Sequence, residues 1–261
     1  MISQYSRPQD IDREFWLDKE KAMYWLKKHT SRKSVEWQLM EDGCDVMDGK
    51  CDYKFSEPIF YTSPQTGNRW LLYIAARRDK QGIVRLYYRP ILYFFTECYM
   101  TIMIAITMCE ENDEGERRSE QNGVNVYTAH MFQRMHERLG VDMSDRIRAI
   151  RNFCEFVGTG WSDTRPPRKG EKHTQVMMRT PASWIKGHTI DIGDRFVTIY
   201  RTFYTDASMT QQQRNYVKSF SKFADKMMRG EAKAKPDDEE KKDGETIAKE
   251  LTKQIIKNNG I

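Results

Sequence analysis

Three basic side chains recur at four-residue spacing in one short segment of the chain. They are His130, Arg134 and Arg138. An α-helix has 3.6 residues per turn, so positions four residues apart lie on adjoining turns of one helix face. A row of cations on one face is suited to hold an anion such as a phosphate group. The segment is therefore the first candidate for a functional site.

A structural interpretation of the same residues stands beside the chemical one. Arg134 and Arg138 could pair with Glu137 or Asp142, and His130 could be a hydrogen-bonded residue near the helix start. Either way a helix is predicted over about residues 128–139, because apolar residues occupy its other side: Met131, Phe132, Met135 and Leu139. His136 points about 120° away from His130 on an ideal helix and is expected to be solvated.

A second group of cations lies in a proline-broken segment. The side chains that could contact a phosphate backbone are Arg165, Arg168, Lys169, Lys172 and His173. The nearby Trp161 and Trp184 could stack on bases. A charge run is equally typical of a solvated loop, and both tryptophans could belong to the core. The two interpretations stay open from the sequence.

Composition indicates a folded, mixed-charge protein. The 261 residues are 39% hydrophobic, and 43 Lys plus Arg against 38 Asp plus Glu give a formal net charge of only +5. A nucleic-acid site would therefore be a local patch, unlike the pervasive basicity of a chromosome-binding protein. An odd number of cysteines and a start without a basic and then apolar region favour the cytoplasm. The spacing of Cys44 and Cys51 fits neither a zinc knuckle nor a thioredoxin motif, and we expect a surface loop there.

One apolar run, residues 91–109, approaches the length of a membrane span. Glu97 would sit in hydrocarbon, and the run is rich in Tyr, Phe, Ile and Thr, which favour strands. We therefore predict two buried strands with a turn near Glu97 and Cys98 and expect no membrane contact.

The rest of the pattern predicts the elements that must position these residues. An N-terminal helix within the first ~40 residues, capped at Asp10 or Asp12, precedes an antiparallel β-meander over about residues 59–109. After a polar linker or loop at 111–123 come the helix already described, a second helix over about 144–156, and strands at 174–179, 184–190 and 196–204. Residues 211–228 favour another helix. The predicted class is α+β: an N-terminal helix and meander, then a helical hairpin packed on an antiparallel sheet.

Residues 127–141, Tyr-Thr-Ala-His-Met-Phe-Gln-Arg-Met-His-Glu-Arg-Leu-Gly-Val, resemble the helix of the RelE, barnase and colicin type nuclease superfamily. The match covers about 30 residues around this helix, and it implies a domain of that type over about residues 124–228. It implies metal-independent RNA cleavage with no cofactor, with His130 as base and His188 or His136 as acid. Arg134, Arg138 and Arg201 would stabilise the anion, and Thr202 or Tyr204 would donate hydrogen bonds. Strand alternation places Arg201 and Thr202 on opposite faces unless a bulge intervenes.

The sequence thus predicts four regions: 1–110, the linker 111–123, the RelE-like region 124–228, and a charged tail 229–261 with at most a short helix. The expected function is metal-independent ribonuclease or RNA binding of toxin or mobile-element type. The rival is a phage or mobile-element interaction module whose aromatic meander binds a protein partner. Metal-dependent chemistry lacks a supporting motif.

Overall fold

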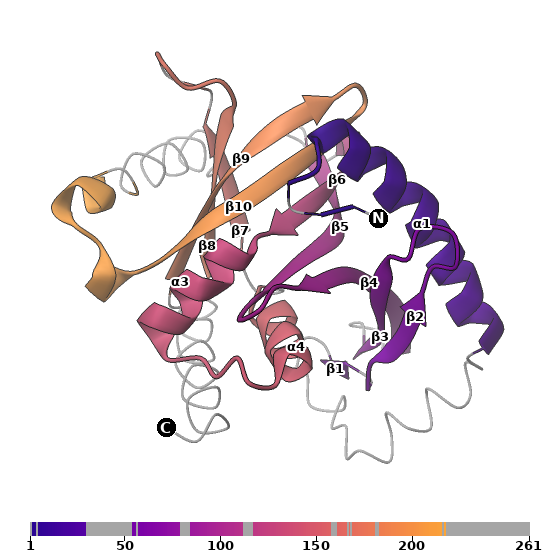
Figure 1. Ribbon diagram of the computed structural model, residues 1–261. Helices are drawn as coiled ribbons and strands as arrows, with labels where there is room; N and C mark the ends of the chain where they lie inside the picture. Colours follow the sequence, from indigo (N-terminus) through magenta and orange to yellow (C-terminus); the bar gives the residue numbers. More distant parts are fainter. Residues whose placement is uncertain are drawn as a thin grey trace. The chain divides into compact units, whose positions relative to one another are not determined.

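A computed structural model describes residues 2–3, 5–29, 54–55, 57–78, 84–111, 117–157, 161–165, 167, 169–180, 183–215 and 217. The chain forms two compact units (Figure 1). The first comprises residues 1–94 and 102–106, and the second comprises residues 95–101 and 107–261. The acidic Cys44 to Asp52 segment and the tail 229–261 lie outside the described residues.

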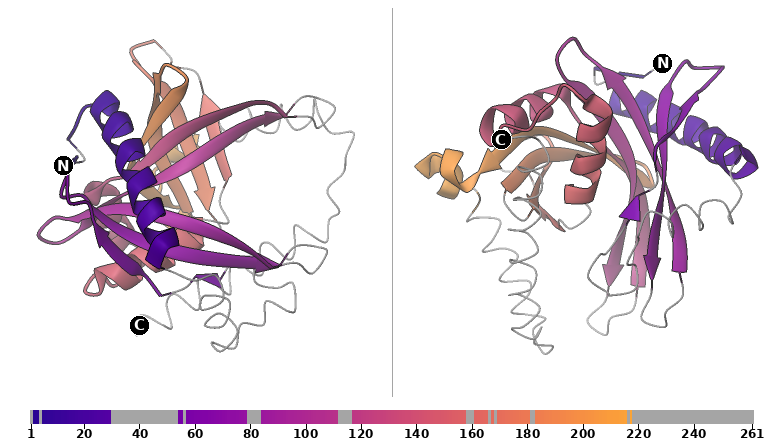
Figure 2. Two further views of the ribbon diagram at one scale, coloured as in Figure 1. Left: turned by 90° about the vertical axis from the view of Figure 1, so that its right-hand side faces the viewer. Right: turned by 90° about the horizontal axis from the view of Figure 1, so that it is seen from below.

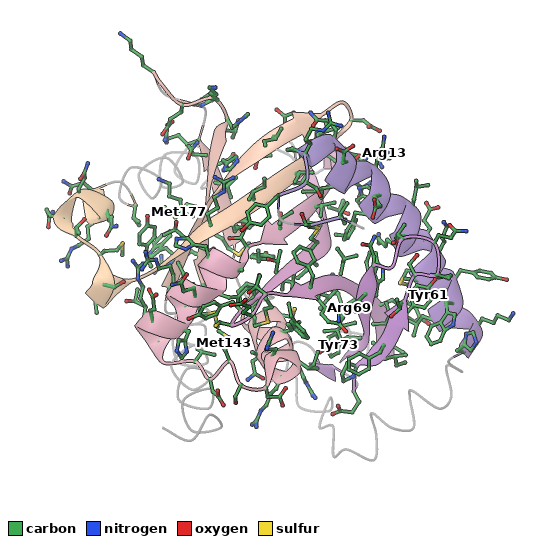
Figure 3. The ribbon with its side chains drawn as sticks, viewed as in Figure 1. Arg13, Tyr61, Arg69, Tyr73, Met143 and Met177 are labelled. Carbon is green, nitrogen blue, oxygen red and sulfur yellow. The ribbon has the colours of Figure 1, made fainter. Side chains whose placement is uncertain are left out.

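The described residues of the first unit form one helix and an antiparallel set of strands. Helix α1 (Pro8–His29) is followed by β1 (Lys54–Phe55), β2 (Ile59–Thr62), β3 (Arg69–Arg78), β4 (Val84–Phe95) and the middle of β5 (Met100–Glu111). The strand order is β1-β3-β4-β5, and β2 pairs with β3. Both β2 and β4 pair with β3 in antiparallel register. Figure 3 shows Arg69 and Tyr73 on β3. The predicted β-meander is confirmed.

Helix α1 is held to β3 by its apolar face. Phe15 is fully buried and its ring lies 5.3 Å from that of Trp70. The helix begins at Pro8, earlier than predicted, so Asp10 lies in its first turn and Asp12 is buried. Proline is favoured there because the first amide of a helix has no acceptor within the helix.

The apolar run 91–109 forms two strands, as predicted. Strands β4 and β5 flank a turn in which the Thr96 amide donates to the Tyr99 carbonyl at 2.8 Å. Glu97 and Cys98 occupy that turn and are exposed. Among the residues described, no helix has the length and apolarity to cross a bilayer.

In the described part of the second unit, two long helices accompany five further strands. In chain order these are β6 (Arg117–Tyr127), α3 (Ala129–Leu139), α4 (Arg146–Val157), β7 (Trp161–Arg165), β8 (Thr174–Thr180), β9 (Ser183–Ile192), β10 (Arg195–Thr205) and the short 3-10 helix η2 (Asp206–Ser208). The strand order is β6-β10-β9-β8-β7. All these pairings are antiparallel except that of β6 with β10, which is parallel.

Helices α3 and α4 form the predicted hairpin, and they lie next to each other in Figure 2. The Thr128 hydroxyl caps α3 by accepting from the Met131 amide, and Gly140 ends the helix at φ 65°. Phe153 of α4 contacts the rings of Tyr127 and Phe132, each at 4.9 Å between centroids. This aromatic contact packs the hairpin on the sheet, and the α+β class is confirmed.

Two local predictions are corrected. The polar stretch 111–123 was expected to be a linker or loop, but β5 ends at Glu111 and β6 begins at Arg117. Pairing explains the difference: Asn122 and Gly123 are already in register with β10, and Asn122 accepts a hydrogen bond from Thr107 at 2.8 Å. Strand β7 was not predicted, because its sequence Trp-Ser-Asp-Thr-Arg carries little apolar alternation. Of the predicted C-terminal helix, residues 211–215 are helical, and most of the rest lies outside the described residues.

Candidate functional site

The sheet of the second unit has two faces with different chemistry. Side chains alternate between faces along a strand, and directly paired residues of neighbouring strands share a face. Tyr200 pairs with Gly187, and its ring stacks on that of Tyr127 at 4.9 Å and 7°. The face of Tyr200 is therefore the buried face against the helical hairpin. His188, one residue after Gly187, points to the opposite face.

The face opposite the hairpin gathers cations from three strands and one loop. We call these side chains the basic face: His173 before β8, Arg179 on β8, Lys186 and His188 on β9, and Arg201 on β10. Strand pairing supports this grouping. Arg179 is in register with Trp184, and Trp184, Lys186 and His188 point to one face because they are two residues apart on β9. Arg179 and Arg201 are exposed, whereas His188 is half-buried.

A β-bulge in β10 brings Arg201 and Thr202, both predicted site residues, to this face. The register of β10 with β9 shifts between Tyr200 and Thr202, leaving Arg201 as the extra residue. Thr202 then pairs with Lys186, which puts it on the face of His188. Strand alternation alone would place Arg201 and Thr202 on opposite faces, and this bulge is the irregularity that lets both face one site.

His188 is the most perturbed basic group of the site. Its ring stacks on that of His173 with centroids 5.5 Å apart and an angle of 21°. Burial, followed by the nearby charges of Arg201 and His173, lowers the pKa of His188 to about 4. The ring is therefore neutral near pH 7, so in the free protein it cannot supply the acid proton that the resemblance implies.

The cations of α3 are arranged differently. His130 is exposed, and among the described residues no hydrogen bond, ion pair or ring contact joins it to His188, Arg201 or Thr202. Arg134 donates to Glu137 at 2.6 Å, and this bond lowers the pKa of Glu137. The structural interpretation of Arg134 is therefore confirmed.

Arg138 and His136 also have structural contacts. Arg138 donates to the carbonyl of Phe203 and lies over the Tyr204 ring, 5.2 Å from its centroid. This links the end of α3 to β10 just after the bulge. His136 is exposed, and its Nδ1 lies 2.7 Å from the Val141 carbonyl.

The residues of the predicted basic loop differ in their exposure to solvent. The expected phosphate contact of Arg165 is corrected. Its side chain is only 7% exposed, and its Nη2 lies 2.9 Å from both carboxylate oxygens of Glu171. It is neutralised and cannot reach an external phosphate. Lys169 and Lys172 are exposed, and Arg168 lies outside the described residues.

Of the two tryptophans expected to stack on bases, the structure describes the side chain of Trp184. Trp184 is only 8% exposed and shares a core cluster with Met177 (labelled in Figure 3), Tyr204, Met209 and Val217. It is a core residue, with Arg179 above its ring at 5.3 Å. The side chain of Trp161 is not among those described.

Sequence reasoning named His173 in the basic loop but did not join it to His188, and it missed Lys186. Lys186 and His188 are two residues apart on a strand, which is a signal for a shared face. His173 precedes β8, and its contact with His188 depends on the pairing of Gln175 with His188. The part of the chain that is described contains no cluster of three or more His, Cys, Asp or Glu side chains able to hold a metal.

No protein-family model, curated protein or solved structure matches this chain. The resemblance of residues 124–228 to the RelE, barnase and colicin type superfamily therefore remains a prediction.

Proposed function

We propose that this protein binds RNA, with the basic face contacting the phosphate backbone. The observation that carries the proposal is the gathering of His173, His188 and Arg201 at one place. Within the described part of the chain, none of the three has a carboxylate partner. Burial and the two neighbouring groups disfavour the protonated ring of His188, and a bound anion would offset that cost.

The surroundings of this cluster favour a polymeric anion. The exposed Arg179 extends the positive charge along β8, and the exposed Lys169 and Lys172 lie in the segment before β8. Contacts to successive phosphates by such a row would give salt-dependent binding without base recognition. The Thr202 hydroxyl can donate one further hydrogen bond to a phosphate oxygen.

The geometry supports binding more strongly than cleavage. Cleavage needs a base and an acid at the same phosphate. Among the described residues, no hydrogen bond, ion pair or ring contact joins His130, the expected base, to the basic face, and Arg134 is paired with Glu137. The ribonuclease activity implied by the resemblance is therefore the less supported form of this proposal.

Charge removal at the bulge tests the proposal. We expect Arg201→Gln to weaken the binding of a fluorescent oligouridine of about 12 nucleotides by about tenfold, measured by fluorescence anisotropy. The slope of log affinity against log salt should fall by about 1, because one phosphate contact is lost. Arg134→Gln is the matched control, since it removes the same charge from α3. Equal weakening by both variants, or none by Arg201→Gln, would contradict the proposal.

The same RNA tests cleavage when it is run on a denaturing gel. If His130 is a catalytic base, His130→Ala should lower the cleavage rate by about 10² or more. If the unaltered protein leaves the RNA intact and binding still depends on Arg201, the protein binds RNA without cleaving it.

A protein-binding role has its own supporting observation in the first unit. Leu17 and Tyr24, two turns apart on α1, are 58% and 72% exposed, and Phe60 on β2 is 56% exposed. Exposed large apolar side chains are a feature of protein interaction sites. Tyr24→Glu should leave RNA binding unchanged under the RNA proposal, and pull-down with the unaltered protein and with this variant tests the protein-binding role.

A further inference from the structure

The rings of His173 and His188 adjoin on the basic face, and Arg201 is near enough to affect the charge of His188. Ring centroids of His173 and His188 are 5.5 Å apart, so one phosphate group is large enough to contact both rings. Arg201, displaced by the bulge, is close enough to His188 to act on its charge. Arg179 and Lys186, by contrast, lie further along the strands, at the pairs with Trp184 and Thr202.

The charged groups around His188 come from every strand packed beside it. Strand β10 contributes Arg201, the segment before β8 contributes His173, and β9 itself contributes Lys186. On β7, Arg165 is in register with Gln175, and its charge is balanced by Glu171. Asp163 of β7 is in register with Met177, in the neighbouring row that includes Lys186. The groups that act on His188 itself are Arg201 and His173.

Once its rings take protons, this cluster can balance more negative charge than one internal phosphodiester carries. A diester carries one negative charge, whereas a phosphomonoester carries about −1.5 to −2 near neutral pH. Arg201 is charged at all relevant pH values, and each histidine can add a further charge by taking a proton. A ligand with a second negative charge gains most from such a cluster, because its attraction also favours protonation of the rings.

We propose that the His173, His188 and Arg201 cluster binds the terminal phosphomonoester of an RNA strand in preference to internal phosphodiesters. This rests on the proposed RNA-binding function and names the part of the strand that the cluster recognises. The remaining cations of the basic face then contact the following phosphates. His188 and Arg201 are the specificity-determining residues.

A spectroscopic consequence separates this arrangement from general charge attraction. In the free protein burial and neighbouring cations disfavour the protonated ring of His188. A bound dianion reverses the sign of the local field and raises the pKa of His188. The ring protons of His188, followed by NMR as the pH is lowered, should show protonation at a higher pH when a phosphorylated oligonucleotide is bound than when the protein is free.

The decisive experiment compares oligouridines that differ only at their ends. Four strands are used: one with both ends as hydroxyls, one with a 5′ phosphate, one with a 3′ phosphate and one with both. We expect at least one terminal phosphate to raise the affinity by about tenfold at neutral pH. His188→Gln and Arg201→Gln should each remove this preference. Arg134→Gln, which lies outside the basic face, should keep it, and thermal melts verify that all three variants fold.

The outcomes distinguish the two proposals. Equal affinity for all four strands, with Arg201→Gln still weakening them, overturns the preference for a terminal phosphate and leaves RNA binding intact. If Arg201→Gln weakens none of them, both proposals fail. Uridine monophosphate is tested as a competitor of the phosphorylated strand. Competition at the concentration of the strand itself would overturn the strand terminus as the ligand and indicate a mononucleotide site.

Discussion

His188 shows how position decides the chemistry of a residue. A free histidine titrates near neutral pH, whereas half-burial beside Arg201 and His173 lowers the pKa of His188 to about 4. His130 has the same side chain but sits exposed at the start of α3. The first is therefore a neutral ring poised to gain a proton with an anion, and the second is a surface group.

Asp18 is a second residue whose role comes from its surroundings. It is fully buried on α1 and accepts hydrogen bonds from Ser63 Oγ at 2.9 Å, Asn68 Nδ2 at 2.7 Å and the Thr66 hydroxyl. These donors all belong to the turn between β2 and β3. The carboxylate therefore fixes the helix to that turn without any cation among these contacts.

We expect Asp18→Ala to lower the free energy of unfolding by about 3 kcal/mol, because buried donors lose their acceptor. Urea denaturation followed by tryptophan fluorescence measures the effect. Asp10→Ala, in the first turn of the same helix, serves as control and should change the stability little. A midpoint for Asp18→Ala equal to that of the unaltered protein would mean that the network is not structural.

At the level of elements, the pairing of β9 with β10 organises the basic face. The bulge at Arg201 adds one residue to β10, which places Thr202 opposite Lys186. Gly187 lies next to this bulge. A Cβ there would come within 2.6 Å of the Ile199 carbonyl oxygen and 2.9 Å of Tyr200 Cδ1. Close approach of the two strands thus requires a glycine at this position.

Gly187→Ala should therefore strain the pairing of β9 with β10. The contact with a backbone oxygen cannot be relieved by rotating a side chain, so we expect a loss of about 1–3 kcal/mol in stability. RNA binding should also weaken, since Arg201 and His188 flank the strained position. Thermal unfolding and fluorescence anisotropy measure the two effects. An unchanged melting temperature together with unchanged RNA affinity would show that β9 and β10 can move apart at residue 187 without loss of stability.

At the level of the whole molecule, the site affects how stability depends on pH. The pKa of His188 is lower in the folded chain than the 6.5 of an ordinary histidine. Between about pH 6.5 and about pH 4 the unfolded chain therefore binds more protons at this residue than the folded one does. The sign is fixed by this difference: stability falls as the pH is lowered through this window.

His188→Gln should remove that part of the acid destabilisation. Relative to the unaltered protein, the melting temperature of the variant should rise as the pH falls from about 7 to about 4.5. Differential scanning calorimetry at several pH values provides the comparison. A constant difference between the two proteins over this range would show that His188 titrates alike in the folded and unfolded chains.

Much of the fold follows from local patterns in the sequence. Helical spacing of Met131, Phe132 and Met135 predicted α3, and alternating aromatic and β-branched residues predicted β2 to β5 and β8 to β10. These signals are local because periods of 3.6 and 2.0 residues describe which side of one element is buried. The β-turn at Glu97 and Cys98 was found for the same reason.

The composition of the candidate site was decided by long-range pairing. The sequence provided His188, Arg201 and Thr202 as candidates, but it could not show the bulge that places them on one face. Nor could it show that His173 stacks on His188, that Glu171 neutralises Arg165, or that β6 pairs with β10 in parallel. Strand register and ion pairing depend on which segments meet in space, and a one-residue shift exchanges the two faces of a sheet. The chain by itself thus determined the elements and their apolar sides, whereas tertiary structure decided which cations share a surface.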